Sequence, residues 1–227
     1  MMNLIWNKES VEIAFTKGYE IEDIKIFNKE CETFLFEILT ESFLLKDKFS
    51  NIEDSLDKAT WLILNDILSS NYDCLQNLKA GNIRMASRIF RDNMENMNIA
   101  EFLNESGNTK FLKTWYKDEI ISHSEYRNWL KQNDVRFSEL IRDVYRIYSK
   151  YAHRTYKTIL ENYSVTNENK LEFKYFIDIN KSDDLKLISK YYSHLSYFIS
   201  NSVLKLAEYS IISKEKLSEI ALKHIGN

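Results

Sequence analysis

Apolar residues recur every three to four positions along most of the chain, which is typical of amphipathic helices. The pattern predicts long helices over residues 21–46, 82–105 and about 134–162, and another from Asp183 or Asp184 to about Ser210. Residues 171–179 instead alternate between apolar and polar, as a strand does. With residues 164–166 as its partner, this segment predicts one β-hairpin.

Local signals predict where some helices begin and end. Gly107 follows the helix predicted over residues 82–105 and suits a C-terminal stop. Ser50 or Asn51 is expected to cap the next helix after residue 46. Ser122 has Glu125 three residues later, which is the capping-box pattern at the start of a short helix.

Composition strengthens the helical prediction. The 227 residues include no proline and only four glycines, and these two residues punctuate turn-rich β folds. We therefore expect an all-α bundle of long antiparallel helices with one short β-hairpin insertion near residues 164–179. A single domain is expected over residues 1–227, with N-terminal helices over 8–46, a central part over about 55–160 and C-terminal helices over 184–224.

Several classes of protein are excluded by what the sequence lacks. No stretch approaches ~18 uncharged apolar residues, and the N-terminus has no signal-peptide pattern, so we expect a cytoplasmic protein that does not enter a membrane. Cys31 and Cys74 lie in apolar helical patterns and are expected to be buried, reduced thiols. The histidines are dispersed, and Glu119 with His123 is interpreted as a solvated surface pair. No metal site, phosphate loop or cofactor is therefore expected.

A stripe of charge follows the helix predicted over residues 82–105. Its members recur at i, i+4, i+7 and i+11: Arg84, Arg88, Arg91 and Glu95. One interpretation is a solvated face with a weak ion pair between Arg91 and Glu95. The other is a functional site.

The helix predicted over residues 134–162 carries the same spacing in Arg142, Arg146, Ser149 and His153. Arg146 and His153 are two turns apart, about 10 Å along the axis. Residues 110–157 contain eleven Lys or Arg and six Asp or Glu, a net charge of +5, whereas the rest of the chain carries −8. This basic centre is the kind of local field that attracts phosphates.

The segment Arg146-Ile-Tyr-Ser-Lys-Tyr-Ala-His153 fits an Arg-x6-His pattern late in a helical bundle. It resembles the signature of the HEPN superfamily, many of whose members are metal-independent endoribonucleases of toxin–antitoxin, phage-defence and CRISPR systems. Gly81, Arg88-x-x-Arg91-x-x-x-Glu95 and Tyr145-x-x-Tyr148-Ser149-x-Tyr151-Ala152-His153 are also similar to a related bacterial family of helical domains of unknown function. The resemblance covers about residues 55–160. One departure is Ile147, because HEPN nucleases usually carry a polar residue after the arginine.

The resemblance implies cleavage of RNA by attack of its own 2′-hydroxyl, without metal or cofactor. His153 would act as general base or acid, and Arg146 would hold the phosphate. One protomer offers one such histidine, so the resemblance implies a homodimer in which two Arg–His sets line a cleft. A toxin or defence effector of this kind can also have an antitoxin or companion defence protein as partner.

Other residues are expected to support that site. Arg91 and Glu95 would form a layer in which Glu95 orients an arginine or His153, with Arg88 and Arg142 nearby. Ser149 would bind substrate or bond back to its own helix. Two tyrosines in the same stretch, Tyr148 and Tyr151, would stack bases or serve as packing residues.

Two other functions remain open. A non-catalytic module could dimerise or bind a partner through the same Arg/Glu/His layer, with His153 as a structural histidine. A ligand sensor would have a basic pocket between helices. Two copies of His153 facing a shared cleft would distinguish the nuclease from both.

Overall fold

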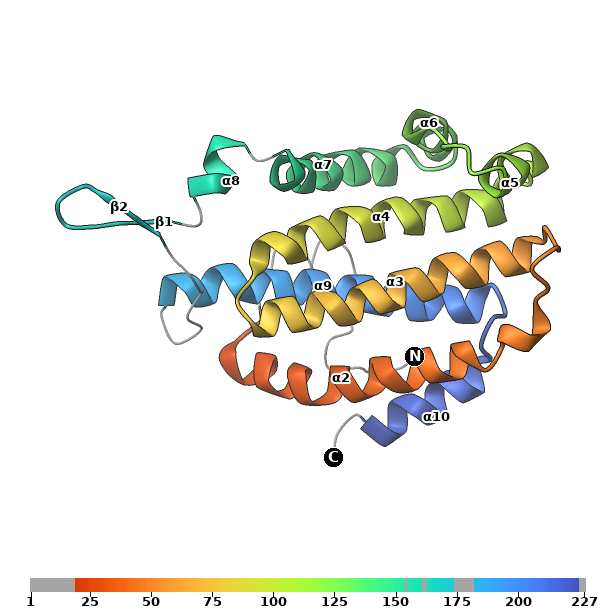
Figure 1. The fold of residues 1–227 in the computed structure, drawn as a ribbon, viewed down its shortest axis with the longest axis horizontal. Coiled ribbons are helices and arrows are strands. Elements are labelled where there is room, and N and C mark those ends of the chain that lie inside the picture. The colour runs from red at the N-terminus through yellow and green to blue at the C-terminus, as the bar shows by residue number, and fades with distance from the viewer. Residues whose placement is uncertain (1–18, 154, 161–162, 174–181, 225–227) are drawn as a thin grey trace.

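The computed structural model describes residues 19–153, 155–160, 163–173 and 182–224 of the chain (Figure 1). The elements in chain order are α2 (Ile21–Phe43), the 3-10 turn η1 (Lys46–Lys48), α3 (Leu56–Lys79), α4 (Ile83–Glu105), α5 (Thr109–Tyr116), α6 (His123–Asn133), α7 (Val135–Ala152), α8 (Tyr156–Leu160), β1 (Tyr163–Val165), β2 (Leu171–Phe173), α9 (Ser182–Glu208) and α10 (Lys214–His224). The predicted all-α bundle with one short hairpin is confirmed.

Three long helices, α3, α4 and α9, form the centre of the bundle and pack against one another. Figure 1 shows α2 and α10 on one side of them and α7 on the other, where α7 contacts α4. The short helices α5 and α6 lie beside the far end of α4, and α6 also packs on α7. The basic segment therefore forms one outer layer of the bundle.

Aromatic rings fill the core between α4, α7 and α9. Phe90 is fully buried, and its ring centroid lies 5.2 Å from Phe198, 5.5 Å from Tyr148 and 6.0 Å from Tyr191. Such ring pairs add about 0.5–1.5 kcal/mol each beyond the area they bury. Phe90 therefore packs α4 against both α7 and α9.

The two cysteines are buried free thiols, as predicted. Burial raises the pKa of both Cys31 and Cys74 well above the ordinary range, so neither is a reactive thiolate.

The start of α3 differs from the prediction. Ser55, not Ser50 or Asn51, is the N-cap, and its hydroxyl accepts a hydrogen bond from the Lys58 amide at 3.3 Å. The Lys58 ammonium is buried and donates to the carbonyls of Ser50 at 3.0 Å, Asn51 at 3.2 Å and Glu53. Because these carbonyls bond a side chain, the segment stays outside the helix.

The end of α7 also differs, because the helix predicted to reach about residue 162 stops at Ala152. His153 is the C-cap, and the next helical turn belongs to the separate α8. The Thr155 amide bonds to the Lys150 carbonyl at 3.2 Å, and the Thr158 hydroxyl donates to the same oxygen at 3.3 Å. These bonds give the Lys150 carbonyl, in the last turn of α7, partners from outside that helix, and α7 ends there.

Other predicted boundaries fit the structure. Gly107 ends α4 with a φ of +64°. Ser122 caps α6, although its hydroxyl accepts from the Ser124 amide and not from Glu125. The hairpin pairs Tyr163 with Phe173 in antiparallel register. The predictions for residues 8–18 and 174–179 lie outside the described residues.

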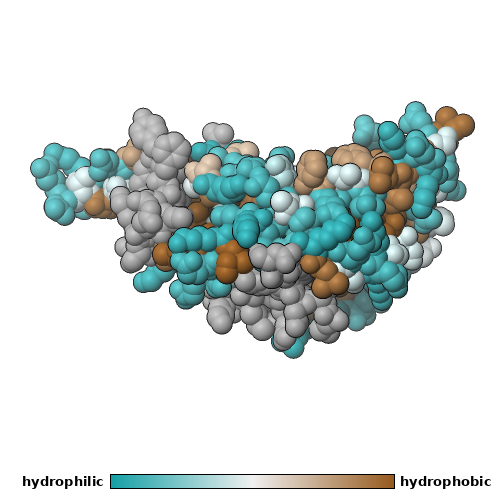
Figure 2. Space-filling model, turned by 90° about the horizontal axis from the view of Figure 1, so that it is seen from below, coloured by the Kyte–Doolittle hydropathy of each residue, from teal (hydrophilic) through white to brown (hydrophobic). Residues whose placement is uncertain are grey.

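On the face seen in Figure 2, hydrophilic residues dominate, and the visible hydrophobic surface forms separate patches. None of the helices in the described part of the chain combines the length and hydropathy that a membrane crossing requires.

Candidate functional site between helices α4 and α7

Arg91, Glu95 and Tyr145 join α4 to α7. Arg91 Nη2 lies 2.9 Å from Glu95 Oε1 and donates to the Tyr145 hydroxyl at 3.1 Å. The guanidinium also sits 5.4 Å from the centre of the Tyr145 ring. Only 25% of the Arg91 side chain and 30% of the Glu95 side chain are exposed. The ion pair within α4 is thus half-buried and not a solvated face, and Arg91 links it to α7 through Tyr145.

The Tyr145 hydrogen bond, together with the charge of Glu95, raises the pKa of Arg91 despite its partial burial. The 2.9 Å contact with Glu95 holds the Arg91 guanidinium in place, and orienting an arginine was one of the two roles expected for Glu95.

The two helices run antiparallel, which sets which residues lie opposite one another. Phe90 of α4 packs on Tyr148 of α7, and Arg91 bonds Tyr145. Continuing this register by one turn places Arg88 opposite Ser149. The Ser149 hydroxyl is buried and has no hydrogen-bond partner among the described residues, so the bond back to its own helix, one of the two roles expected for it, is not formed.

Arg146 and His153 lie on the outer side of α7. Arg146 is 75% exposed, and its guanidinium is 3.8 Å from Asp143, which also lies 3.5 Å from Arg142. His153 is exposed at the end of the helix, where it is the C-cap. Neighbouring positions on a helix are about 100° apart, so Arg146 points away from the Arg91 layer that Tyr145 faces. The structure does not bring the two arginine sets into one cluster.

The two tyrosines differ. Tyr148 is 1% exposed, and its hydroxyl lies 2.7 Å from His194 Nδ1 in the core, so it is a packing residue and cannot stack a base. Tyr151 is half-buried, with its ring centroid 6.5 Å from that of Tyr191.

His123 is the residue that sequence reasoning missed. Its ring lies 4.4 Å from that of Tyr145, and its Nε2 is buried without a hydrogen-bond partner among the described residues. Burial lowers the pKa of His123, Arg127 and Arg91 lower it further, and Glu95 opposes them. The interpretation as a solvated pair with Glu119 is therefore wrong. No sequence spacing links His123 to Tyr145, because they lie on different helices.

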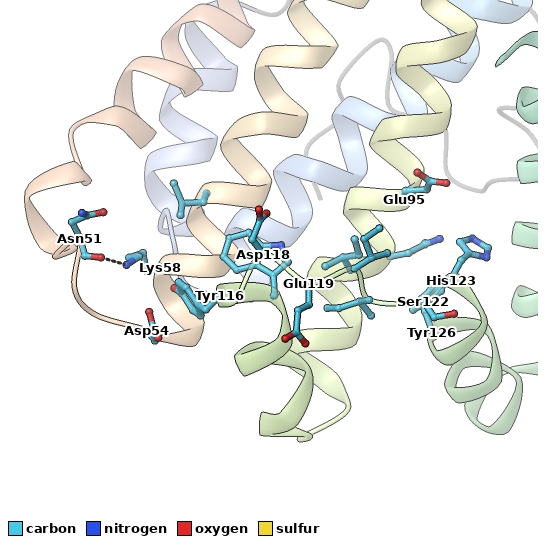
Figure 3. A pocket seen from close by; sticks show the side chains of 16 residues that line it. Asn51, Asp54, Lys58, Glu95, Tyr116, Asp118, Glu119, Ser122, His123 and Tyr126 are labelled. Atoms are coloured by element: carbon cyan, nitrogen blue, oxygen red, sulfur yellow. Dashed lines mark hydrogen bonds between the residues drawn. The ribbon is translucent and has the colours of Figure 1, made fainter.

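A cavity of about 750 Å³ opens beside His123, between α3, α4, α5 and α6 (Figure 3). Figure 3 shows His123 and Glu95 at one end, Lys58 at the other and Tyr116 between them. Its aromatic and acidic lining residues are Trp115, Tyr116, Tyr126, Asp54, Glu95, Asp118 and Glu119. The lining is acidic, whereas a ligand sensor was expected to have a basic pocket.

No group of three or more histidine, cysteine, aspartate or glutamate side chains in the described residues is placed to hold a metal ion. In comparisons with known proteins, the chain matches no family model, no curated protein and no solved structure.

Proposed function

We propose that this protein is a metal-independent endoribonuclease of the HEPN type, acting in the cytoplasm as a toxin or phage-defence effector. The observation that supports it is the exposure of Arg146 and His153 on one side of α7. Both functional groups can reach a substrate without unfolding the bundle. A histidine largely buried among aromatic rings, as His194 is, could not serve in this way.

The chemistry needs a base, an acid and a cation. The imidazole of His153 takes the proton of a ribose 2′-hydroxyl, whose oxygen then attacks the neighbouring phosphorus. The Arg146 guanidinium donates to the non-bridging phosphate oxygens as charge develops on them. The 5′-oxygen leaves with a proton from a second imidazole, which a homodimer supplies from the other protomer. The products are a 2′,3′-cyclic phosphate and a 5′-hydroxyl.

The Arg91 layer has a positioning role in this proposal. Glu95 holds the Arg91 guanidinium, and the bond of Arg91 to Tyr145 fixes α7 against α4 and so fixes the direction in which Arg146 and His153 point. Loss of Arg91 is then expected to lower the rate of cleavage without removing the chemical groups.

The decisive experiment incubates purified protein with RNA in the presence of a chelator. Wild type is expected to cleave, and His153→Ala and Arg146→Ala are expected to abolish cleavage. Lys48→Ala removes an exposed charge from η1 and serves as the matched control with wild-type activity. Intact RNA with wild type, or equal cleavage by His153→Ala, would refute the proposal. Sedimentation tests the dimer separately, since an active monomer contradicts it.

The cavity favours ligand sensing as a second candidate function. Aromatic walls and carboxylates suit a ligand that carries a protonated amine. Asn98 is buried and lines the cavity, and its Nδ2, which has no hydrogen-bond partner among the described residues, can donate to an acceptor such as the phenolic oxygen of tyramine. Spermidine and tyramine are expected to raise the thermal stability of wild type more than that of Asp118→Asn, and citrate is the anionic control. Equal shifts for both proteins contradict this function.

A further inference from the structure

A second hollow, of about 290 Å³, lies between α6 and α7. Three cations line it, Arg127 and Lys131 from α6 and Arg142 from α7, against one carboxylate, Glu139. Its other lining residues are Ser124, Asn128 and Ser138. Cationic side chains from two helices thus converge on one space, together with short polar side chains that can donate hydrogen bonds.

The charge of this hollow is only partly compensated within the described residues. The ion pair of Arg142 goes to Asp143, outside the hollow, at 3.5 Å. The Nε of Arg127 is buried and has no hydrogen-bond partner among the described residues. A buried donor without an acceptor costs about 1–3 kcal/mol, and an anionic oxygen would recover that cost.

The hollow is continuous with the outer side of α7. Arg142, Arg146, Lys150 and His153 follow one another at spacings of four, four and three residues, and all are exposed. We call this set the α7 strip. From Arg142 to His153 the strip spans about 16 Å along the axis. A single strand of RNA lying along the α7 strip would meet a cation at nearly every turn of the helix.

We propose that the hollow between α6 and α7 is a phosphate subsite, which holds a backbone phosphate of a single-stranded RNA lying along the α7 strip. This inference rests on the proposed function, because it places the scissile bond at His153. A free phosphate ion offers the same chemistry, but the continuity of the hollow with the strip favours a phosphate that belongs to a chain. Arg and Lys contacts to the backbone would position the strand without reading its sequence.

The test measures binding of a fluorescent single-stranded RNA of about a dozen nucleotides by anisotropy, over a range of salt. The protein carries His153→Ala so that the RNA stays intact. Adding Arg127→Gln and Lys131→Gln is expected to weaken binding and to reduce the slope of log K against log salt by about 1.4, since each lost contact to a single strand removes about 0.7. Lys110→Gln with Lys113→Gln, two exposed residues of α5, is the matched control and should keep the slope.

Each outcome of this test either supports or overturns the phosphate subsite. A slope unchanged by the α6 pair, or changed equally by the control pair, overturns the subsite. Inorganic phosphate that binds the hollow, with RNA affinity unaffected by the α6 pair, assigns the site to free phosphate and also overturns it. Circular dichroism melts establish that the variants fold.

The two proposals fail separately. RNA binding that depends on Arg127 and Lys131, in a wild type that leaves RNA intact, keeps the subsite and refutes the nuclease. Cleavage by wild type, with a salt slope that the α6 pair does not change, keeps the nuclease and refutes the subsite.

Discussion

Acid should destabilise this fold through His194, whose ring is largely buried among aromatic side chains. Its ring lies 5.8 Å from those of Phe90 and Tyr191 and 5.9 Å from that of Tyr148. Burial, with a smaller contribution from Lys190, lowers its pKa from 6.5 to about 3. The ring is therefore neutral in the folded protein, and its Nδ1 shares a hydrogen bond of 2.7 Å with the Tyr148 hydroxyl.

The sign and size of the effect follow from proton linkage. Below about pH 6.5 the unfolded chain binds a proton at this ring that the folded chain does not, until the pH reaches the folded pKa. The contribution of His194 to stability is complete above about pH 6.5. It decreases as the pH falls from there toward the folded pKa of about 3. At 1.36 kcal/mol per pH unit, the free energy of unfolding should be lower by about 2 kcal/mol at pH 5 than at pH 8 from this group alone. That is a large part of the 5–15 kcal/mol typical of a folded protein.

Urea unfolding followed by circular dichroism at several pH values measures this directly. His194→Asn removes the buried imidazole and should remove about 2 kcal/mol of pH dependence. Tyr148→Phe removes the hydrogen bond but keeps the burial, so it should lower stability by about 1 kcal/mol while retaining the pH dependence. If His194→Asn loses as much stability in acid as wild type does, the assignment to this buried ring is refuted.

Three further changes test the packing. Phe90→Ala should cost about 3–5 kcal/mol in urea unfolding because it opens a cavity among three rings, and a cost below that of Phe90→Leu would contradict this. Lys58→Met should cost about 1–3 kcal/mol and speed proteolysis between residues 50 and 55, since three carbonyls lose their donor; unchanged proteolysis would argue against it. Gly107→Ala should cost about 1 kcal/mol in thermal unfolding through its positive φ, and Gly107→Asn should cost less.

Much of the fold follows from the apolar pattern. The helices α2, α4 and α9 lie close to their predicted ranges, and the alternation that begins at Leu171 marks a strand. The errors occur at helix ends. An apolar pattern continues through Ile159, yet the hydroxyl of Thr158 and the amide of Thr155 satisfy the Lys150 carbonyl and end α7 earlier. Competing hydrogen bonds of this kind do not change the spacing of apolar residues, so the apolar pattern cannot reveal them.

The candidate site could be predicted only in part. The pairing of Arg91 with Glu95 follows from i, i+4 spacing, because both belong to one helix. The contact of Arg91 with Tyr145, and the ring contact of His123 with Tyr145, join residues from different helices. Neither contact could be predicted from the spacing of residues along the sequence.

The sequence by itself determined the helical class, the hairpin, the buried thiols and the residues that share one face of a helix, because each depends on repeats within a few turns of the chain. Only the tertiary structure decided that Arg146 and His153 face outward, that Tyr148 is sealed in the core and that His123 joins the Arg91 layer. These features depend on how α6 and α7 pack on α4, and that packing is set by the fit of side chains between helices far apart in sequence.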